Sequence, residues 1–146
     1  MKVVVPAVSS DCPTILALRK EGVEFRMWQI ENDYSYSDMF VQLWKEGEGF
    51  VSIEHDIVPW PGAIEEISIC VYKHWCSYEY PLAPGTLRPA LGCFKVSNWI
   101  VRTYPLLYKM WENKTWNYLD GSVCPALESI VGTTHIHTPP LAHVKP

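Results

Sequence analysis

The sequence lacks the features that mark membrane-spanning, disulfide-rich and nucleic-acid-binding proteins. Its longest apolar runs are far shorter than the roughly 20 residues that a bilayer span requires. The chain has a net charge of −4 and no cluster of Lys and Arg, which disfavours a nucleic-acid surface. The five cysteines form an odd set without a Cys-x-x-Cys pair. We therefore expect reduced thiols in a cytoplasmic protein rather than a disulfide framework.

Three common catalytic or cofactor motifs are also absent. The sequence contains no Gly-x-Gly-x-x-Gly and no Walker loop, so a dinucleotide cofactor and a phosphate-cradling ATP loop are both disfavoured. It also has no Gly-x-Ser-x-Gly elbow, which argues against an ordinary serine hydrolase.

Hydrophobic and aromatic residues are plentiful. Hydrophobic residues make up 48% of the 146 positions, enough for the core of a single domain that spans residues 1–146. Seven tryptophans and eight tyrosines are many for this length. They serve either as packing residues or as flat surfaces that stack on a sugar or a base.

Strand and helix patterns alternate along the chain. Apolar, β-branched runs predict strands over residues 2–8, 23–30, 50–56, 75–80, 91–96 and 133–138. Caps and helical periodicity predict helices over about 10–22, 36–47 and 61–74, a pair after Ser97 split by Pro105, and a last helix from Asp120 to about 132. Residues 81–89 read as an irregular loop and 139–146 as a tail. This order predicts a three-layer α/β/α domain with a mainly parallel central sheet.

The third predicted strand leads directly into Glu54, His55 and Asp56. Residues two apart on a strand share a face, so Glu54 and Asp56 are expected to face the same space. Two carboxylates in that arrangement repel each other unless a cation lies between them. Ligands in open α/β sheets bind at the carboxyl ends of strands. We therefore predict a Mn²⁺ or Mg²⁺ site beside a phosphate-bearing ligand; the alternative is a pair of solvated loop acids.

Other polar residues have more than one interpretation. Asp33 follows the second strand, where an acid in a nucleotide-binding fold contacts ribose or base. His135 and His137 share a face of the last strand, as a transition-metal pair or as packing residues. Cys70, His74 and Cys76 lack a fourth ligand and a standard zinc spacing, so we predict that they are packing residues.

The acidic segment Glu54–Asp56 and four further segments resemble, in their order along the chain, the GT-A class of nucleotide-sugar glycosyltransferases, whose fold is Rossmann-like. The four others are Val3–Val8, Leu91–Val96, Trp116–Asp120 and Thr138–His143. The acidic motif departs from the family's Asp-x-Asp at its first position. The resemblance implies roles for ten residues: nucleotide-sugar contacts by Pro6, Ala7, Val8, Glu54, His55, Gly92 and Cys93, metal binding by Asp56 and His143, and base catalysis by Asp120. Asp33 joins the nucleotide-sugar contacts by its position after the second strand.

The function implied by the resemblance is a metal-dependent, inverting transfer of a sugar from a nucleoside-diphosphate sugar to a hydroxyl acceptor. For Asp120 the alternative is a helix N-cap. One alternative for the whole chain is a metal-dependent hydrolase that uses His135, His137, His143 and Asp56. Another is a non-catalytic carbohydrate-binding module. Donor, acceptor and oligomeric state are not readable from the residues.

Overall fold

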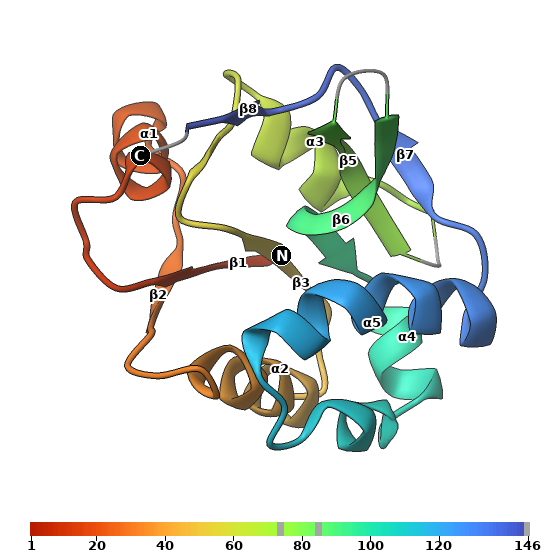
Figure 1. The fold of residues 1–146 in the computed structure, drawn as a ribbon. Coiled ribbons are helices and arrows are strands. Elements are labelled where there is room, and N and C mark those ends of the chain that lie inside the picture. The colour runs from red at the N-terminus through yellow and green to blue at the C-terminus, as the bar shows by residue number, and fades with distance from the viewer. Residues whose placement is uncertain (73–74, 84–85, 145–146) are drawn as a thin grey trace.

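The computed structural model describes the backbone of residues 1–72, 75–83 and 86–144, and their side chains except at positions 80–90. Strands and helices alternate through most of the chain (Figure 1). In order they are β1 (Lys2–Ala7), α1 (Pro13–Glu21), β2 (Arg26–Gln29), α2 (Ser35–Lys45), β3 (Phe50–Ile53), β4 (Ile57–Val58), α3 (Ala63–Ile69), β5 (Trp75–Ala83), β6 (Thr86–Val96), α4 (Asn98–Thr103), the 3-10 helix η1 (Leu107–Trp111), α5 (Trp116–Ile130), β7 (His135–His137) and β8 (Ala142–His143).

Six strands form the central sheet in the order β2-β1-β3-β6-β5-β7. β1 pairs in parallel with β2 and β3, and β5 pairs in parallel with β7. β6 is antiparallel to both of its neighbours. Five strands therefore run in one direction and β6 alone runs against them, which confirms the prediction of a mixed α/β fold with a mainly parallel sheet.

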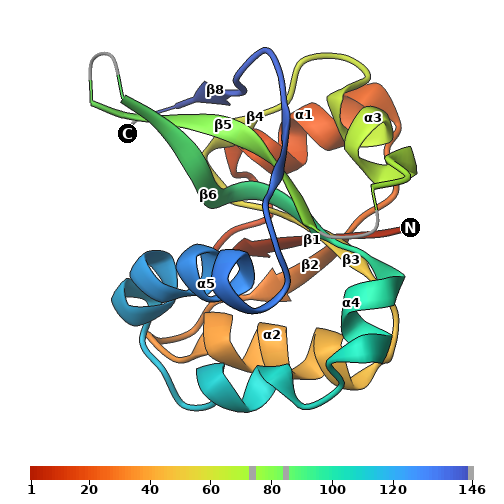
Figure 2. The ribbon, with the colours of Figure 1, turned by 90° about the vertical axis from the view of Figure 1, so that its right-hand side faces the viewer.

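Helices cover both faces of this sheet, with α1 and α3 on one side and α2, α4 and α5 on the other (Figure 2). Alternation along the strands supplies a core to each side. On β1, Val4 packs with α2 and α5, whereas Val3 and Val5 pack with α1 and α3. Strands apolar on both faces are what a sheet buried between two helical layers requires.

Two glycines meet specific backbone needs. Gly22 ends α1 in the left-handed conformation, with φ at 78°. A Cβ on Gly49 would lie 2.5 Å from the Val96 carbonyl oxygen, so only glycine allows the start of β3 to approach the end of β6 this closely. In agreement with prediction, Gly22 closes the first helix. Ser97 caps α4 by accepting from the Ile100 N–H.

Most of the described tryptophans are structural. Trp44, Trp75 and Trp111 are buried, and two of them donate their indole N–H to carbonyls, Trp44 to Tyr104 and Trp75 to Gly132. Such pairing is what a buried indole needs. Trp116 is the exception, because it faces a cavity described below.

The predicted loop over residues 81–89 is wrong wherever the structure describes it. β5 continues through Ala83 and β6 starts at Thr86, so the two strands form a long antiparallel hairpin. The register shifts between Ser77 and Glu79 and between Pro81 and Ala83. Such irregularities accommodate prolines, which regular strand pairing excludes. The prolines in this segment were therefore wrongly taken as evidence of a loop.

Four other expectations need correction. The last helix begins at Trp116 rather than Asp120. The helix predicted over 61–74 is α3, which ends at Ile69, and Val71 beyond it is exposed. His74 lies outside the described residues. The helix predicted over about 10–22 is α1, which begins only at Pro13, and its Leu16 is 52% exposed. The expected tail contains β8, which pairs with β4. None of the helices in the described ranges is long and apolar enough to span a bilayer.

Candidate functional site

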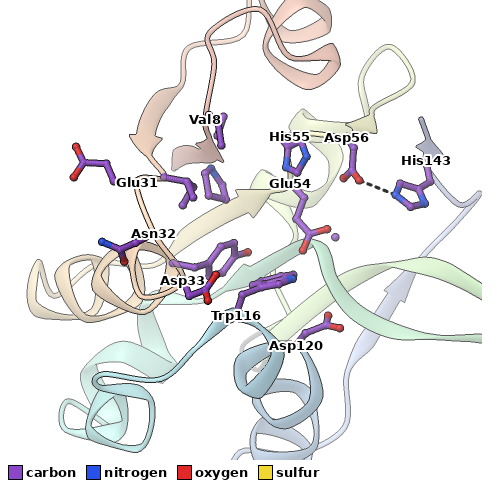
Figure 3. A pocket seen from close by; sticks show the side chains of 15 residues that line it. Val8, Glu31, Asn32, Asp33, Glu54, His55, Asp56, Trp116, Asp120 and His143 are labelled. Carbon is purple, nitrogen blue, oxygen red and sulfur yellow. Dashed lines mark hydrogen bonds and ion pairs between the residues drawn. The ribbon is translucent and has the colours of Figure 1, made fainter. Parts of the chain in front are cut away.

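A cavity of about 650 Å³ opens where β1, β2 and β3 end. These three strands are parallel, so their carboxyl ends meet at one edge of the sheet. Its volume lies within the range of about 300–1,000 Å³ that small-molecule sites occupy. Figure 3 shows the side chains that line it. They are Pro6, Ala7, Val8, Ile30, Glu31, Asn32, Asp33, Tyr36, Glu54, His55, Asp56, Gly92, Trp116, Asp120 and His143.

The acidic segment is a turn and not the end of a strand. β3 stops at Ile53, and the Ile57 N–H donates to the Glu54 carbonyl, which closes a turn over residues 54–57. Buried Thr14 on α1 supports this turn, since its hydroxyl contacts the Glu54 and Ile57 carbonyls and accepts from the Ile57 N–H. Glu54 and Asp56 both line the cavity, as expected. The reason that we gave for this, alternation along a strand, is wrong, because the two residues lie in a turn.

Asp56 and His143 are in direct contact. His143 Nε2 lies 2.8 Å from Asp56 Oδ2. The backbone brings them together, because β4 and β8 pair with Ile57 opposite His143 and the Val144 N–H donates to the Asp56 carbonyl. The other carboxylate oxygen, Asp56 Oδ1, is buried and has no hydrogen-bond partner in the described part of the chain. An unpaired buried carboxylate oxygen is costly unless a donor or a cation meets it.

Glu54 reaches into the cavity between Asp56 and Asp120 (Figure 3). Burial, followed by the charges of Asp56 and Asp120, raises the pKa of Glu54 to about 8. Burial, with Glu54 as the next cause, also raises the pKa of Tyr36 well above its ordinary value. The cavity floor therefore concentrates acidic groups that favour a cation or a hydrogen-bond donor.

The opposite end of the cavity is lined by Pro6, Ala7 and Val8 from the end of β1 and by the residues that follow β2. The Ile30 N–H donates to the Ala7 carbonyl, and the Trp116 N–H donates to the Asp33 carbonyl. The second contact fixes the first turn of α5 beside the β2 end. The Trp116 ring packs on Tyr36 with centroids 4.4 Å apart.

Four lining residues have no role in our sequence-based prediction, namely Ile30, Glu31, Asn32 and Tyr36, and Trp116 was named only within a segment. Tyr36 shows the expected i, i+3, i+4 periodicity of α2, so the sequence assigned it to the core. The three residues 30–32 lie between β2 and Asp33, which was predicted to contact the ligand. Their position next to Asp33 was the feature of the sequence from which they could have been assigned to the site.

Asp120 faces the cavity from the second turn of α5. Its expected alternative role, capping the helix N-terminus, is wrong because Thr115 occupies the N-cap position. Cys93 does not line the cavity but lies buried in the sheet, where burial raises the pKa of its thiol above the ordinary value. His135 and His137 do not line it either, so the structure does not bring together the histidine set of the hydrolase alternative.

Comparison with known proteins finds similarity only at the level of the fold. Neither a family model nor a curated protein sequence matches the chain. One solved structure with a similar fold is a glycosyltransferase involved in the glycosylation of the major capsid of PBCV-1. It shares 15% identity at a TM-score of 0.53, over 94% of this chain and 81% of that one. Another is A197 from STIV, with 16% identity and a TM-score of 0.48, over 69% of this chain and 67% of that one. The chain thus has a glycosyltransferase-like fold.

Proposed function

We propose that the protein transfers a sugar from a nucleoside-diphosphate sugar to a hydroxyl acceptor. The observation that carries this proposal is the cavity, in which apolar residues with Asn32 and the acids Glu31 and Asp33 line one end, and Glu54, Asp56 and Asp120 line the other. A nucleoside-diphosphate sugar has the same division, with a flat base at one end and a diphosphate and sugar at the other. The glycosyltransferase-like fold supports the same reading.

The residues at the acidic end fit a divalent cation. Asp56 offers a buried, unpaired Oδ1, and Glu54 lies beside it in the cavity. His143, held against Asp56 Oδ2, orients the carboxylate and is the proposed nitrogen ligand. Oxygen-rich sites of this kind suit Mn²⁺ or Mg²⁺. When bound, the cation would neutralise negative charge on a diphosphate leaving group.

The rest of the donor would contact the strand ends. Pro6, Ala7 and Val8 offer an apolar surface to the base, and Asp33 and Asn32 offer polar groups to base or ribose. Trp116 supplies a flat ring between this end and the acids, suited to stacking on a sugar face. Gly92 brings backbone close to the acidic turn, because its carbonyl accepts from the Glu54 N–H.

Asp120 is the proposed general base. The acceptor oxygen attacks the anomeric carbon while the bond from that carbon to the diphosphate oxygen breaks, and the diphosphate leaves with the electron pair. The Asp120 carboxylate takes the hydroxyl proton. Asp120 lies on α5, across the cavity from Asp56 (Figure 3). With the diphosphate held at Asp56, we propose that the base acts from the opposite side and that the transfer inverts the anomeric carbon.

Nucleotide binding tests the proposal. We expect one nucleoside diphosphate among those of uridine, guanosine, cytidine and adenosine to raise the melting temperature with Mn²⁺ and not with chelator. At 100 times the dissociation constant the shift is roughly 8 °C. Asp56→Asn is expected to abolish the shift, whereas Asp38→Asn, an exposed acid on α2 outside the cavity, keeps it.

Asp120→Asn separates binding from chemistry. We expect this variant to keep the nucleotide-induced shift and to lose at least about 100-fold in donor turnover, since a general base contributes about 10²–10⁴-fold. An equal shift in Mn²⁺ and chelator, or the absence of any nucleotide-induced shift, would contradict the proposed function.

A further inference from the structure

A second group of ligand-type side chains lies at the other edge of the sheet, at β7. Cys70 follows α3, Cys76 lies on β5, and His135 and His137 lie on β7. One ligand atom from each residue lies within 4.8 Å of the other three. Cys70 Sγ and His135 Nδ1 are 3.2 Å apart. None of these residues lines the cavity described above.

Strand register explains why the sequence concealed this group. β5 and β7 pair in parallel with Cys76 opposite His135, so the two side chains share a face. His137, two residues further, projects to the same face, and its ring centroid is 4.6 Å from that of His135. Cys70 reaches the face from the end of α3. The prediction that Cys70, His74 and Cys76 lack a fourth ligand is therefore wrong, because β7 brings two histidines to the two cysteines and makes a set of four without His74.

His137 has the surroundings of an oriented metal ligand. The residue is 8% exposed, and its Nε2 is buried without a hydrogen-bond partner in the residues described. Its Nδ1 lies 3.5 Å from Glu66 Oε2, and the Tyr78 hydroxyl is 2.9 Å from the same oxygen. A carboxylate on one ring nitrogen directs the lone pair of the other nitrogen outward, which is the usual second contact of metal-bound histidine.

Lys95 adds positive charge beside the cysteines. It is 3% exposed, and it lies opposite Cys76 where β5 and β6 pair. Its ammonium donates to the Ser68 carbonyl at 3.0 Å and to the Cys70 carbonyl at 2.6 Å. These contacts fix the backbone that carries Cys70. Burial, and next the neighbouring Cys70, raise the pKa of the Cys76 thiol to about 12, and the charge of Lys95 offsets this only in part. Zinc binding therefore has to displace the thiol protons.

We propose that Cys70, Cys76, His135 and His137 bind one Zn²⁺ ion in a closed tetrahedral site. Bond lengths of about 2.0–2.3 Å place tetrahedral ligands roughly 3.3–3.8 Å apart, so only small shifts are needed. Two thiolates balance the charge of the ion. Four protein ligands leave no open position, so the ion is structural and cross-links α3, β5 and β7. This proposal is independent of the glycosyl-transfer proposal.

Metal content and cobalt spectroscopy test the zinc site. The full chain, purified in reductant with Zn²⁺ and without a metal-binding tag, is expected to retain one equivalent after dialysis. Co²⁺ in its place should give tetrahedral d–d bands and a thiolate charge-transfer band. Chelation should lower the melting temperature. Cys70→Ser, at the half-buried ligand position, should lose both the zinc and the charge-transfer intensity of one thiolate.

Matched variants separate this site from the rest of the chain. Cys12→Ser changes a cysteine outside both this group and the cavity and should keep the full equivalent. Glu66→Gln should weaken zinc binding by roughly 10–100-fold if Glu66 orients His137. If Cys70→Ser fails to fold, His135→Gln, at an exposed position, carries the same test.

Three outcomes overturn the proposal. One is a wild-type chain that retains no zinc and gives no thiolate-to-cobalt band. Another is zinc that remains at one equivalent in both Cys70→Ser and His135→Gln. The third is a mass two hydrogens lower in the reductant-purified chain with a Cys70–Cys76 disulfide in its peptide map.

Discussion

Replacement of Glu54 by glutamine is expected to stabilise the fold. Burial, then the charges of Asp56 and Asp120, raises the pKa of Glu54 from the ordinary 4.5 to about 8. The native state therefore holds the proton at pH 7, while the unfolded chain releases it. Each pH unit between the two pKa values costs up to about 1.4 kcal/mol, so after relaxation of the site we expect a gain of about 2 kcal/mol at pH 7.

The direction of the pKa shift determines the pH range over which Glu54 destabilises the fold. Because the folded-state pKa is raised, the destabilising contribution of Glu54 is absent below pH 4.5, grows as pH rises to about 8, and is constant above it. Urea denaturation of wild type and Glu54→Gln from pH 4 to pH 9, in chelator, measures it. The two proteins should be equally stable at pH 4, and the variant should become progressively more stable up to pH 8.

A matched substitution isolates the cause. Glu48→Gln removes the same charge from an exposed position outside the cavity, and it reports the general effect of one fewer acid. If Glu54→Gln is no more stable than wild type at pH 8, or if its advantage does not change with pH, the electrostatic reasoning is refuted. Mn²⁺ with the cognate nucleotide should narrow the gap, since a bound cation favours ionised Glu54.

Two further predictions concern stability elsewhere. Gly49→Ala should lower the free energy of unfolding by more than about 2 kcal/mol in denaturant titrations, because its Cβ would lie 2.5 Å from the Val96 carbonyl oxygen. Gly121→Ala, whose Cβ meets no atom within 4 Å inside α5, should raise the free energy of unfolding by about 1 kcal/mol. Equal effects of the two substitutions would contradict the clash. For Glu46, burial acts to raise the pKa, but hydrogen bonds from Arg26, Lys2 and Gln42 outweigh it and lower the pKa to about 2. Glu46→Gln should therefore cost about 1 kcal/mol at pH 7, discounted for solvent screening, and the difference from wild type should disappear as pH falls from 4.5 to 2; a difference that persists at pH 2 would contradict this.

Much of the fold could be predicted from short-range patterns of residues. Apolar runs located β1, β3 and the core part of β6, and the i, i+3, i+4 spacing located α2. These signals depend on neighbours a few residues away, so they survive in the sequence. Where packing overrode local preference, prediction failed: α5 contains Gly121 and Pro125, yet it is helical from Trp116 because its apolar face packs on the sheet.

The candidate site shows the same division. Asp56 and His143 were named from the sequence, but their contact depends on the pairing of β4 with β8, two strands that the sequence did not reveal. Cys93 was assigned to the site because Leu91–Val96 resembles a site segment of the glycosyltransferase family, but Cys93 packs in the core of the sheet and does not line the cavity.

By itself the sequence determined the layered α/β architecture and the strand ends at which polar residues gather, because periodicity and caps are local properties. The tertiary structure alone decided that the acidic segment is a turn supported by Thr14, 40 residues away, and that two cysteines meet two histidines across β5 and β7. Contacts over such distances arise from strand register and helix packing, which no short stretch of residues encodes.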